Sequence, residues 1–125
     1  MACYVDGFVL VVPGRKLAAY RKMAALAGRV WREHGALQYV ECVGDDLKVK
    51  AGCGLAFPKM AKAKKGERVL FSLIVYKSRA HRDRVNKKVM ADPRLEKMCD
   101  IDDMPFDLKR MAYGGFKSIV DLRGK

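Results

Sequence analysis

Two segments of this chain, Tyr4–Val12 and Glu67–Tyr76, are typical of β-strands that are apolar on both faces. Valine, leucine, isoleucine and phenylalanine dominate them, and these residues favour the pleated geometry of a strand. An antiparallel sheet with helices on one side normally leaves its other face polar and wet. A sheet built around these two strands therefore needs cover on both faces, which is the strongest constraint on the fold.

The rest of the chain alternates between helical and strand patterns. Apolar residues recur every three or four positions before Gly35, a suitable C-terminal cap, while Ser78 is a suitable N-cap and Pro93 a suitable first residue of two further helices. The expected strands are 4–12, 36–44, 67–76 and 110–120, the expected helices are 15–34, 79–90 and 93–98, and residues 45–66 are expected to be a long connection holding a short hairpin or edge strand.

The order β-α-β-loop-β-α-β predicts an α+β, ferredoxin-like fold, with an antiparallel sheet and both helices on one face. We expect residues 1–125 to form a single domain, because the length suits one core. A second copy of the chain is the simplest cover for the other sheet face, since a twofold interface pairs one patch with itself. The sequence therefore predicts a homodimer that closes into a dimeric α+β barrel.

Two adjacent glycines, Gly114 and Gly115, interrupt the last expected strand. Glycine packs no side chain and costs backbone entropy in a strand, so it usually marks a bulge, a bend or a close approach. We expect the last strand to bend at this point and to curve around a partner.

Four short motifs are spread over nearly the whole chain: Tyr4-Val5-Asp6-Gly7-Phe8, Glu41-Cys42-Val43-Gly44-Asp45-Asp46, Met90-Ala91-Asp92-Pro93-Arg94, and Met104-Pro105-Phe106-Asp107 followed by Tyr113-Gly114-Gly115-Phe116. Together they resemble the YbaA-like bacterial family, whose function is unknown. The resemblance implies a dimeric α+β-barrel fold. It implies no catalytic residues.

Two carboxylates, Asp6 and Glu41, lie inside apolar strands. A buried charge is costly unless it is paired, and Arg110 at the start of the last strand is a candidate partner. We predict a polar cluster of these three residues on the sheet, with structural pairing favoured over a binding or acid–base role. The cavity-lining candidates are Tyr39, Tyr76 and Tyr113, although aromatic residues in strands usually belong to the core.

The chain carries 26 Lys and Arg against 14 Asp and Glu, a formal net charge of +12. This charge favours attraction to polyanions, and Lys62, Lys64 and Lys65 are the candidate contacts. Any such binding is expected to be weak and lost at high salt, because no RNA-binding motif with stacking aromatic residues is present. A solvated basic surface is the favoured alternative.

The residue spacings of the sequence do not favour a metal site or a cofactor. The four cysteines are scattered without a Cys-x-x-Cys pair, so we expect reduced, mostly buried thiols and no metal. The acids between Asp100 and Asp107 begin like a calcium loop but lack its glycine and its final glutamate. His34 and His81 show no pairing typical of catalysis, and no cofactor is implied.

The leading hypothesis is a homodimeric protein that binds a small molecule. Alternatives are a cofactor-free monooxygenase-like enzyme, by analogy with similar barrels, a non-specific RNA-binding protein, and a purely structural or interaction protein. No apolar run has the roughly 20 residues that span a bilayer, and the apolar stretch near the N-terminus is too short for a signal peptide. We therefore expect a cytoplasmic protein that does not enter membranes.

Overall fold

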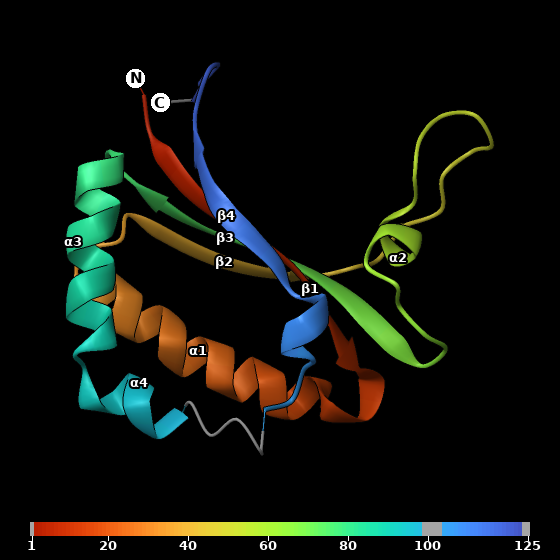
Figure 1. The fold of residues 1–125 in the computed structure, drawn as a ribbon, viewed down its shortest axis with the longest axis horizontal. Coiled ribbons are helices and arrows are strands. Elements are labelled where there is room, and N and C mark those ends of the chain that lie inside the picture. Colours follow the sequence, from red (N-terminus) through yellow and green to blue (C-terminus); the bar gives the residue numbers. More distant parts are fainter. Residues whose placement is uncertain (1, 99–103, 124–125) are drawn as a thin grey trace.

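A computed structural model describes residues 2–98 and 104–123 of the chain. The fold is α+β and ferredoxin-like, which confirms the predicted class: one antiparallel sheet in the order β2-β3-β1-β4, with the three longer helices packed on one face (Figure 1). Its strands are β1 (Tyr4–Pro13), β2 (Gln38–Val43), β3 (Glu67–Tyr76) and β4 (Ala112–Lys117), and its helices are α1 (Leu17–Glu33), α2 (Phe57–Met60), α3 (Arg79–Met90) and α4 (Pro93–Met98).

Most element boundaries follow the sequence pattern. The α3 and α4 helices span the predicted residues, the side-chain hydroxyl of Ser78 accepts a hydrogen bond from the His81 backbone, and Gly35 has a φ of +115° beyond the end of α1. Two predictions are wrong. The connection between β2 and β3 holds the short helix α2 and no described strand, and β4 starts only at Ala112 because the 3-10 turn η3 (Leu108–Arg110) takes up the preceding residues.

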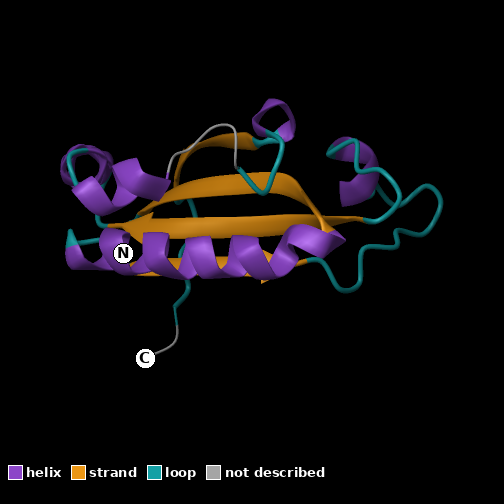
Figure 2. Ribbon diagram, turned by 90° about the horizontal axis from the view of Figure 1, so that it is seen from below, coloured by secondary structure: helices purple, strands orange, loops and turns teal. Residues whose placement is uncertain are grey.

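The helix-covered face of the sheet contains the core. Figure 2 shows α1 running lengthwise along the strands. One cluster of buried side chains joins α1, β3, α3 and α4, and a second joins β1, α1 and β3. The fully buried members include Tyr76, Leu10, Val12, Val30, Val85 and Val89. Burial of this apolar area stabilises the packing of the helices on the sheet, by about 25 cal/mol for each Å² removed from water.

The opposite face of the sheet, which we call the open face, carries one charged residue in the four strands, Glu67 at the start of β3, and its carboxylate is paired with Arg110. Its other residues by register are Val5, Gly7, Val9, Val11, Pro13, Gln38, Val40, Cys42, Val69, Phe71, Leu73, Val75, Ala112, Gly114 and Phe116. The connection that holds α2 covers one end of it, where Val11 and Val69 pack with Ala61. Beyond that end the face is partly exposed: Phe71 and Phe116 are 45% and 63% exposed, whereas Val75 is buried.

The two glycines of β4 have different surroundings. A Cβ on Gly115 would lie 2.7 Å from Cε2 of Tyr4, so the Tyr4 ring needs the space that glycine leaves. Gly114 pairs with Gly7 on the open face, and a Cβ there would meet nothing within 4 Å. Of the features that strand glycines usually mark, a close approach is therefore found at Gly115, where a side chain makes it.

The motif around Asp92 and Pro93 fastens α4 to the end of α1. The Asp92 carboxylate lies 2.8 Å from Nε2 of His34 and accepts from the Arg94 guanidinium at 2.9 Å, while Arg94 also donates to Glu33 at 2.9 Å. These hydrogen bonds hold the pKa of Asp92 well below its usual range. These contacts give the motif a structural role, the attachment of α4 to α1.

The prediction of mostly buried thiols is wrong. Cys42 and Cys53 are exposed, because Cys42 lies on the open face and Cys53 lies in the connection between β2 and β3, whereas Cys3 is half-buried. Cys99 lies outside the described residues. Within 2–98 and 104–123, no helix combines the length and the apolar character needed to cross a membrane.

Candidate functional site

A carboxylate held by two phenols is the main polar feature beneath α1. The Tyr20 hydroxyl donates to Oε1 of Glu41 at 2.7 Å, and the Tyr39 hydroxyl donates to Oε2 at 2.7 Å. Burial, reinforced by the neighbouring carboxylate, raises the pKa of Tyr20 and of Tyr39 well above the ordinary tyrosine value. Both phenols therefore stay protonated and keep donating to Glu41.

Local geometry explains this arrangement. Tyr39 and Glu41 are two residues apart in β2, so both side chains point to the helix-covered face. Tyr20 is buried on the facing side of α1. The helix can come this close because Gly28 has no side chain: a Cβ there would lie 2.7 Å from Cδ1 of Tyr39. Gly28 therefore sets the position of the Tyr39 ring.

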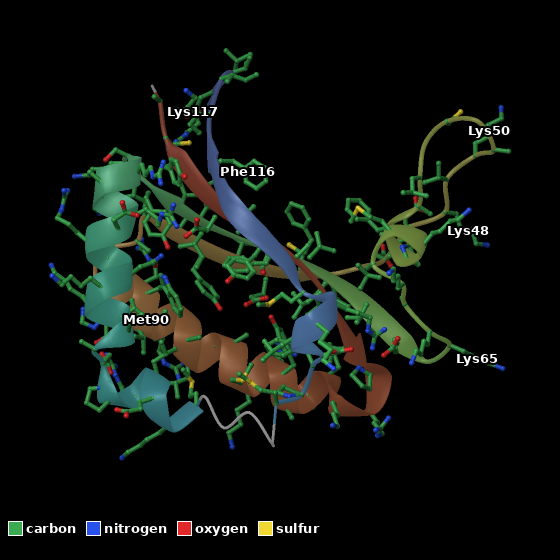
Figure 3. The ribbon with its side chains drawn as sticks, viewed as in Figure 1. Lys48, Lys50, Lys65, Met90, Phe116 and Lys117 are labelled. Atoms are coloured by element: carbon green, nitrogen blue, oxygen red, sulfur yellow. The ribbon has the colours of Figure 1, made fainter. Side chains whose placement is uncertain are left out.

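The three residues lie at one end of a cavity of about 270 Å³ between α1, the sheet, α4 and the segment before β4. Apart from them and Ser72, the described lining is apolar and rich in methionine and aromatic side chains. Its members include Phe8, Leu10, Trp31, Ile74, Leu95 and Phe106, together with Met23, Met90, Met98, Met104 and Met111. Figure 3 shows Met90 near the lower end of α3.

An outer groove of about 700 Å³ runs on the other side of Glu41, between α1 and the edge strand β2. Glu41 and the two tyrosines line this groove as well, so they separate it from the cavity. Its rim carries three arginines of α1, namely Arg21, Arg29 and Arg32. None of them forms an ion pair with Glu41 among the described residues.

Asp6 lies on the same face as Glu41 but belongs to a separate group. Its register partner in β3 is Ile74, whereas the partner of Glu41 is Ser72. Asp6 is buried and lies 3.5 Å from the Arg82 guanidinium of α3, which also donates to the Tyr4 hydroxyl at 3.2 Å. Burial raises the pKa of Asp6, with Arg82 opposing the rise.

The predicted cluster of Asp6, Glu41 and Arg110 is not formed. Arg110 lies in the η3 turn, where its guanidinium donates twice to the Glu67 carboxylate at 2.7 Å and once to Asp107 at 2.9 Å. Glu67 pairs with Pro13 in the register, at the far end of β1 from Asp6. The turn before β4, which sequence periodicity did not indicate, is what moves Arg110 away.

The remaining sequence-predicted residues divide between cavity, core and surface. Of the three tyrosines, Tyr39 lines the cavity, Tyr76 is fully buried and donates to Asn86 at 3.2 Å, and Tyr113 is 70% exposed and stacks on Phe8. Neither histidine lines the cavity. Lys62, Lys64 and Lys65 are exposed at the end of the connection before β3, and Lys48, Lys50 and Lys65 project from that connection in Figure 3.

Three residues of the site, Tyr20, Gly28 and Ser72, are not among those predicted from the sequence. Tyr20 falls on the apolar stripe of the first predicted helix, and a tyrosine on a buried helix face needs a hydrogen-bond partner. Gly28 in the middle of a helix was a usable signal, because glycine there is unfavourable unless another group packs closely against it. Of the acids that begin like a calcium loop, Asp100, Asp102 and Asp103 lie outside the described residues, and Asp107 caps η3.

Comparison with known proteins gives the following relatives. The family model described as "Protein of unknown function (DUF1428)" matches residues 3–108. The uncharacterized protein YbaA of Escherichia coli K12 is 49% identical over 118 residues, which is 94% of this chain and 97% of that protein. The YbaA protein of Shigella flexneri matches with the same identity and coverage.

Two solved structures share the fold. A nipsnap family protein of unknown function from Agrobacterium tumefaciens has a TM-score of 0.56 at 14% identity, covering 93% of this chain and 87% of that one. SnoaB, a cofactor-independent oxygenase from Streptomyces nogalater, has a TM-score of 0.54 at 11% identity, covering 98% and 97%. At these identities the likeness concerns the fold alone.

The first expected outcome concerns Gly28→Ala. At an open helical site this change stabilises a protein by roughly 0.5–1 kcal/mol, because alanine is the better helix former. Here we expect the opposite sign, a loss of about 1–3 kcal/mol in the free energy of unfolding, because the new methyl group would overlap the Tyr39 ring. Urea denaturation measures the difference, and stabilisation by Gly28→Ala would contradict the described contact.

A second expected outcome concerns acid stability. The hydrogen bonds from Arg110 lower the pKa of Glu67 from its ordinary 4.5 to about 2. Glu67 therefore adds to the free energy of unfolding above pH 4.5, and this contribution is lost as the pH falls toward 2, because the unfolded chain takes up the proton first. Arg110→Gln should lower stability at neutral pH and flatten this acid dependence.

Denaturant midpoints across the acid range test this expectation. The control is Arg79→Gln, which changes an exposed arginine at the start of α3. If Arg110→Gln kept the acid dependence of the parent protein, the pairing with Glu67 would contribute nothing.

Proposed function

The chain belongs to the DUF1428 family of proteins of unknown function, and we propose that it is a homodimeric protein that binds a small, largely apolar molecule in the cavity beneath α1. One observation carries the binding proposal: the carboxylate of Glu41, with its two tyrosines, lies at one end of an otherwise apolar cavity. Ligand sites are typically apolar hollows with a few convergent polar groups that fix orientation.

The desolvation cost of the Glu41 carboxylate favours binding over a purely structural role. Placing a carboxylate between a helix and a sheet costs desolvation energy that its hydrogen bonds only partly offset, and apolar side chains of similar volume would often fold as well or better. Asp6 and Glu67 have cationic partners, whereas Glu41 has only neutral donors among the described residues. An uncompensated charge facing a cavity suits recognition of a ligand.

An enzymatic form of the proposal is oxygenase-like turnover of the bound molecule. SnoaB, which has the same fold, is a cofactor-independent oxygenase. Oxygen consumption that depends on the bound molecule would distinguish turnover from binding alone.

Filling the cavity should abolish binding without unfolding the protein. Ala27 lies on α1 and lines the cavity, so Ala27→Leu would place a larger apolar side chain in the space of the ligand. We expect at least about a tenfold loss of affinity for whatever small molecule copurifies with the parent protein, equivalent to about 1.4 kcal/mol. The matched control is Ala19→Leu, at an exposed position of the same helix.

Native mass spectrometry and solvent extraction of the purified proteins provide the measurement. The parent and Ala19→Leu should carry the same molecule, and Ala27→Leu should lack it. Equal occupancy in all three proteins would place the molecule elsewhere and contradict the proposal.

The dimer proposal concerns the open face of the sheet. Apart from Glu67 at its end, which is paired with Arg110, this face bears no charge and is largely apolar, although the chain as a whole carries +12. Two copies of so basic a protein repel each other wherever lysines and arginines face one another, and an uncharged apolar face avoids that repulsion. A second copy supplies a matching apolar surface, and a twofold arrangement pairs the face with itself.

Light scattering at low micromolar concentration tests the dimer. We expect twice the chain mass of 14.1 kDa for the parent protein. Leu73→Glu places a charge at the centre of the open face and should give a folded monomer, because it buries an unpaired carboxylate in the interface. Leu55→Glu, which changes an exposed leucine of the connection before α2, is the matched control and should remain dimeric.

A parent protein that scatters as a monomer would contradict the dimer. A Leu73→Glu protein that remains dimeric would show that the dimer interface lies on another surface.

A further inference from the structure

If the cavity binds a small molecule as proposed, on which this step rests, the groups at its polar end decide what that molecule must carry. We infer that the ligand presents a hydrogen-bond donor, a hydroxyl or an amino group, to Glu41 and holds an apolar body of one or two rings among the methionine and aromatic side chains. The chemical class is an apolar phenol, alcohol or amine, and anionic molecules are excluded.

The protons at the polar end are already committed. A phenol has one hydroxyl proton, and Tyr20 and Tyr39 each donate theirs to Glu41 at 2.7 Å. A carboxylate can accept about four hydrogen bonds, so Glu41 retains about two free acceptor positions. The phenolic oxygens add acceptor lone pairs. What this end offers a ligand is therefore acceptors, and a ligand must supply the donor.

The other polar groups of the lining do not change this conclusion. The indole nitrogen of Trp31 donates to Asn86 at 3.1 Å and is occupied. Ser72 is buried beside Glu41 in the register and can accept or donate, as any hydroxyl can. It offers no charge to balance that of Glu41.

No cationic side chain of residues 2–98 and 104–123 lines the cavity, so an anionic ligand would meet Glu41 without compensation there. The arginines of α1 lie on the rim of the outer groove and do not line the cavity. The guanidinium of Arg32 is in addition bonded to the backbone carbonyls of Ala36, at 2.8 Å, and Leu37. Two like charges in one poorly solvated site repel strongly, so a carboxylate or phosphate is disfavoured.

The lining and size of the cavity define the rest of the ligand. Five methionines offer polarizable, adaptable walls, and Trp31, Phe8 and Phe106 offer ring faces and edges. The volume of about 270 Å³ lies just below the range of roughly 300–1,000 Å³ that holds drug-sized ligands. A body of one or two rings suits this space.

A matched series of probes tests the donor requirement. The series is para-isopropylphenol, para-isopropylbenzylamine, isopropylbenzene and para-isopropylbenzoate, which share one apolar body and differ in the polar group. Trp31 is the single tryptophan and lines the cavity, so its fluorescence reports binding, with calorimetry as a second readout. We expect the phenol and the amine to bind at least about tenfold more tightly than the hydrocarbon and the benzoate, since only the first two donate a hydrogen bond to a charged group.

Variants assign the effect to Glu41. Glu41→Gln should weaken the phenol and the amine about tenfold and leave the hydrocarbon unchanged, because the amide lacks the charge and brings protons of its own. Glu96→Gln, at an exposed position of α4, is the matched control and should alter none of the four affinities. The comparison of probes on the parent protein tests the donor requirement even if Glu41→Gln does not fold.

The outcomes separate the ligand class from the binding function. If the benzoate binds as tightly as the phenol, or if all four probes bind equally, the donor requirement is overturned while binding in the cavity stands. If none of the probes binds, the proposed binding function is overturned, and the ligand class with it.

Discussion

The close approach of α1 to β2 at Gly28 is the contact on which the rest of the molecule depends. Glycine at this position lets the Tyr39 ring lie against the helix backbone, and the Tyr39 hydroxyl then reaches Glu41 from one side while Tyr20 reaches it from the other. A larger residue would lift the helix from the sheet and separate the two phenols. One missing side chain thus fixes both the helix packing and the polar end of the cavity.

The two faces of the sheet have different proposed roles, ligand binding on the helix-covered face and dimer formation on the open face. The helix-covered face contains every carboxylate that is placed in β1 and β2, and each has hydrogen-bond or ionic partners. The open face has only Glu67, which is paired with Arg110 at the start of β3, and this is the face proposed to meet a second copy. Because successive strand residues point to opposite faces, one short segment such as Cys42 and Glu41 can serve both surfaces.

Periodicity predicted the elements well because it reports which face of a segment is buried. It therefore identified β1, α1, β3, α3 and α4, and it marked Asp6 and Glu41 as unusual strand carboxylates. It could not predict which groups meet them, since Tyr20 reaches Glu41 across 21 residues of chain and Arg82 reaches Asp6 across 76. The sequence of the 3-10 turn that brings Arg110 to Glu67 shows no hydrophobic periodicity. For that reason the predicted three-residue cluster was wrong.

Ultraviolet titration of tyrosine ionisation tests the central claim, the Glu41 site with its two phenols, most directly. Burial and the Glu41 charge raise the pKa of Tyr20 and Tyr39 above the ordinary 10.0, so around that pH neither tyrosine should ionise while the protein stays folded. Tyr20→Phe and Tyr39→Phe should therefore give the same phenolate absorbance as the parent protein. If either variant lost the absorbance of one tyrosine with a midpoint near 10.0, that phenol would be free in solvent and the site would not exist as described.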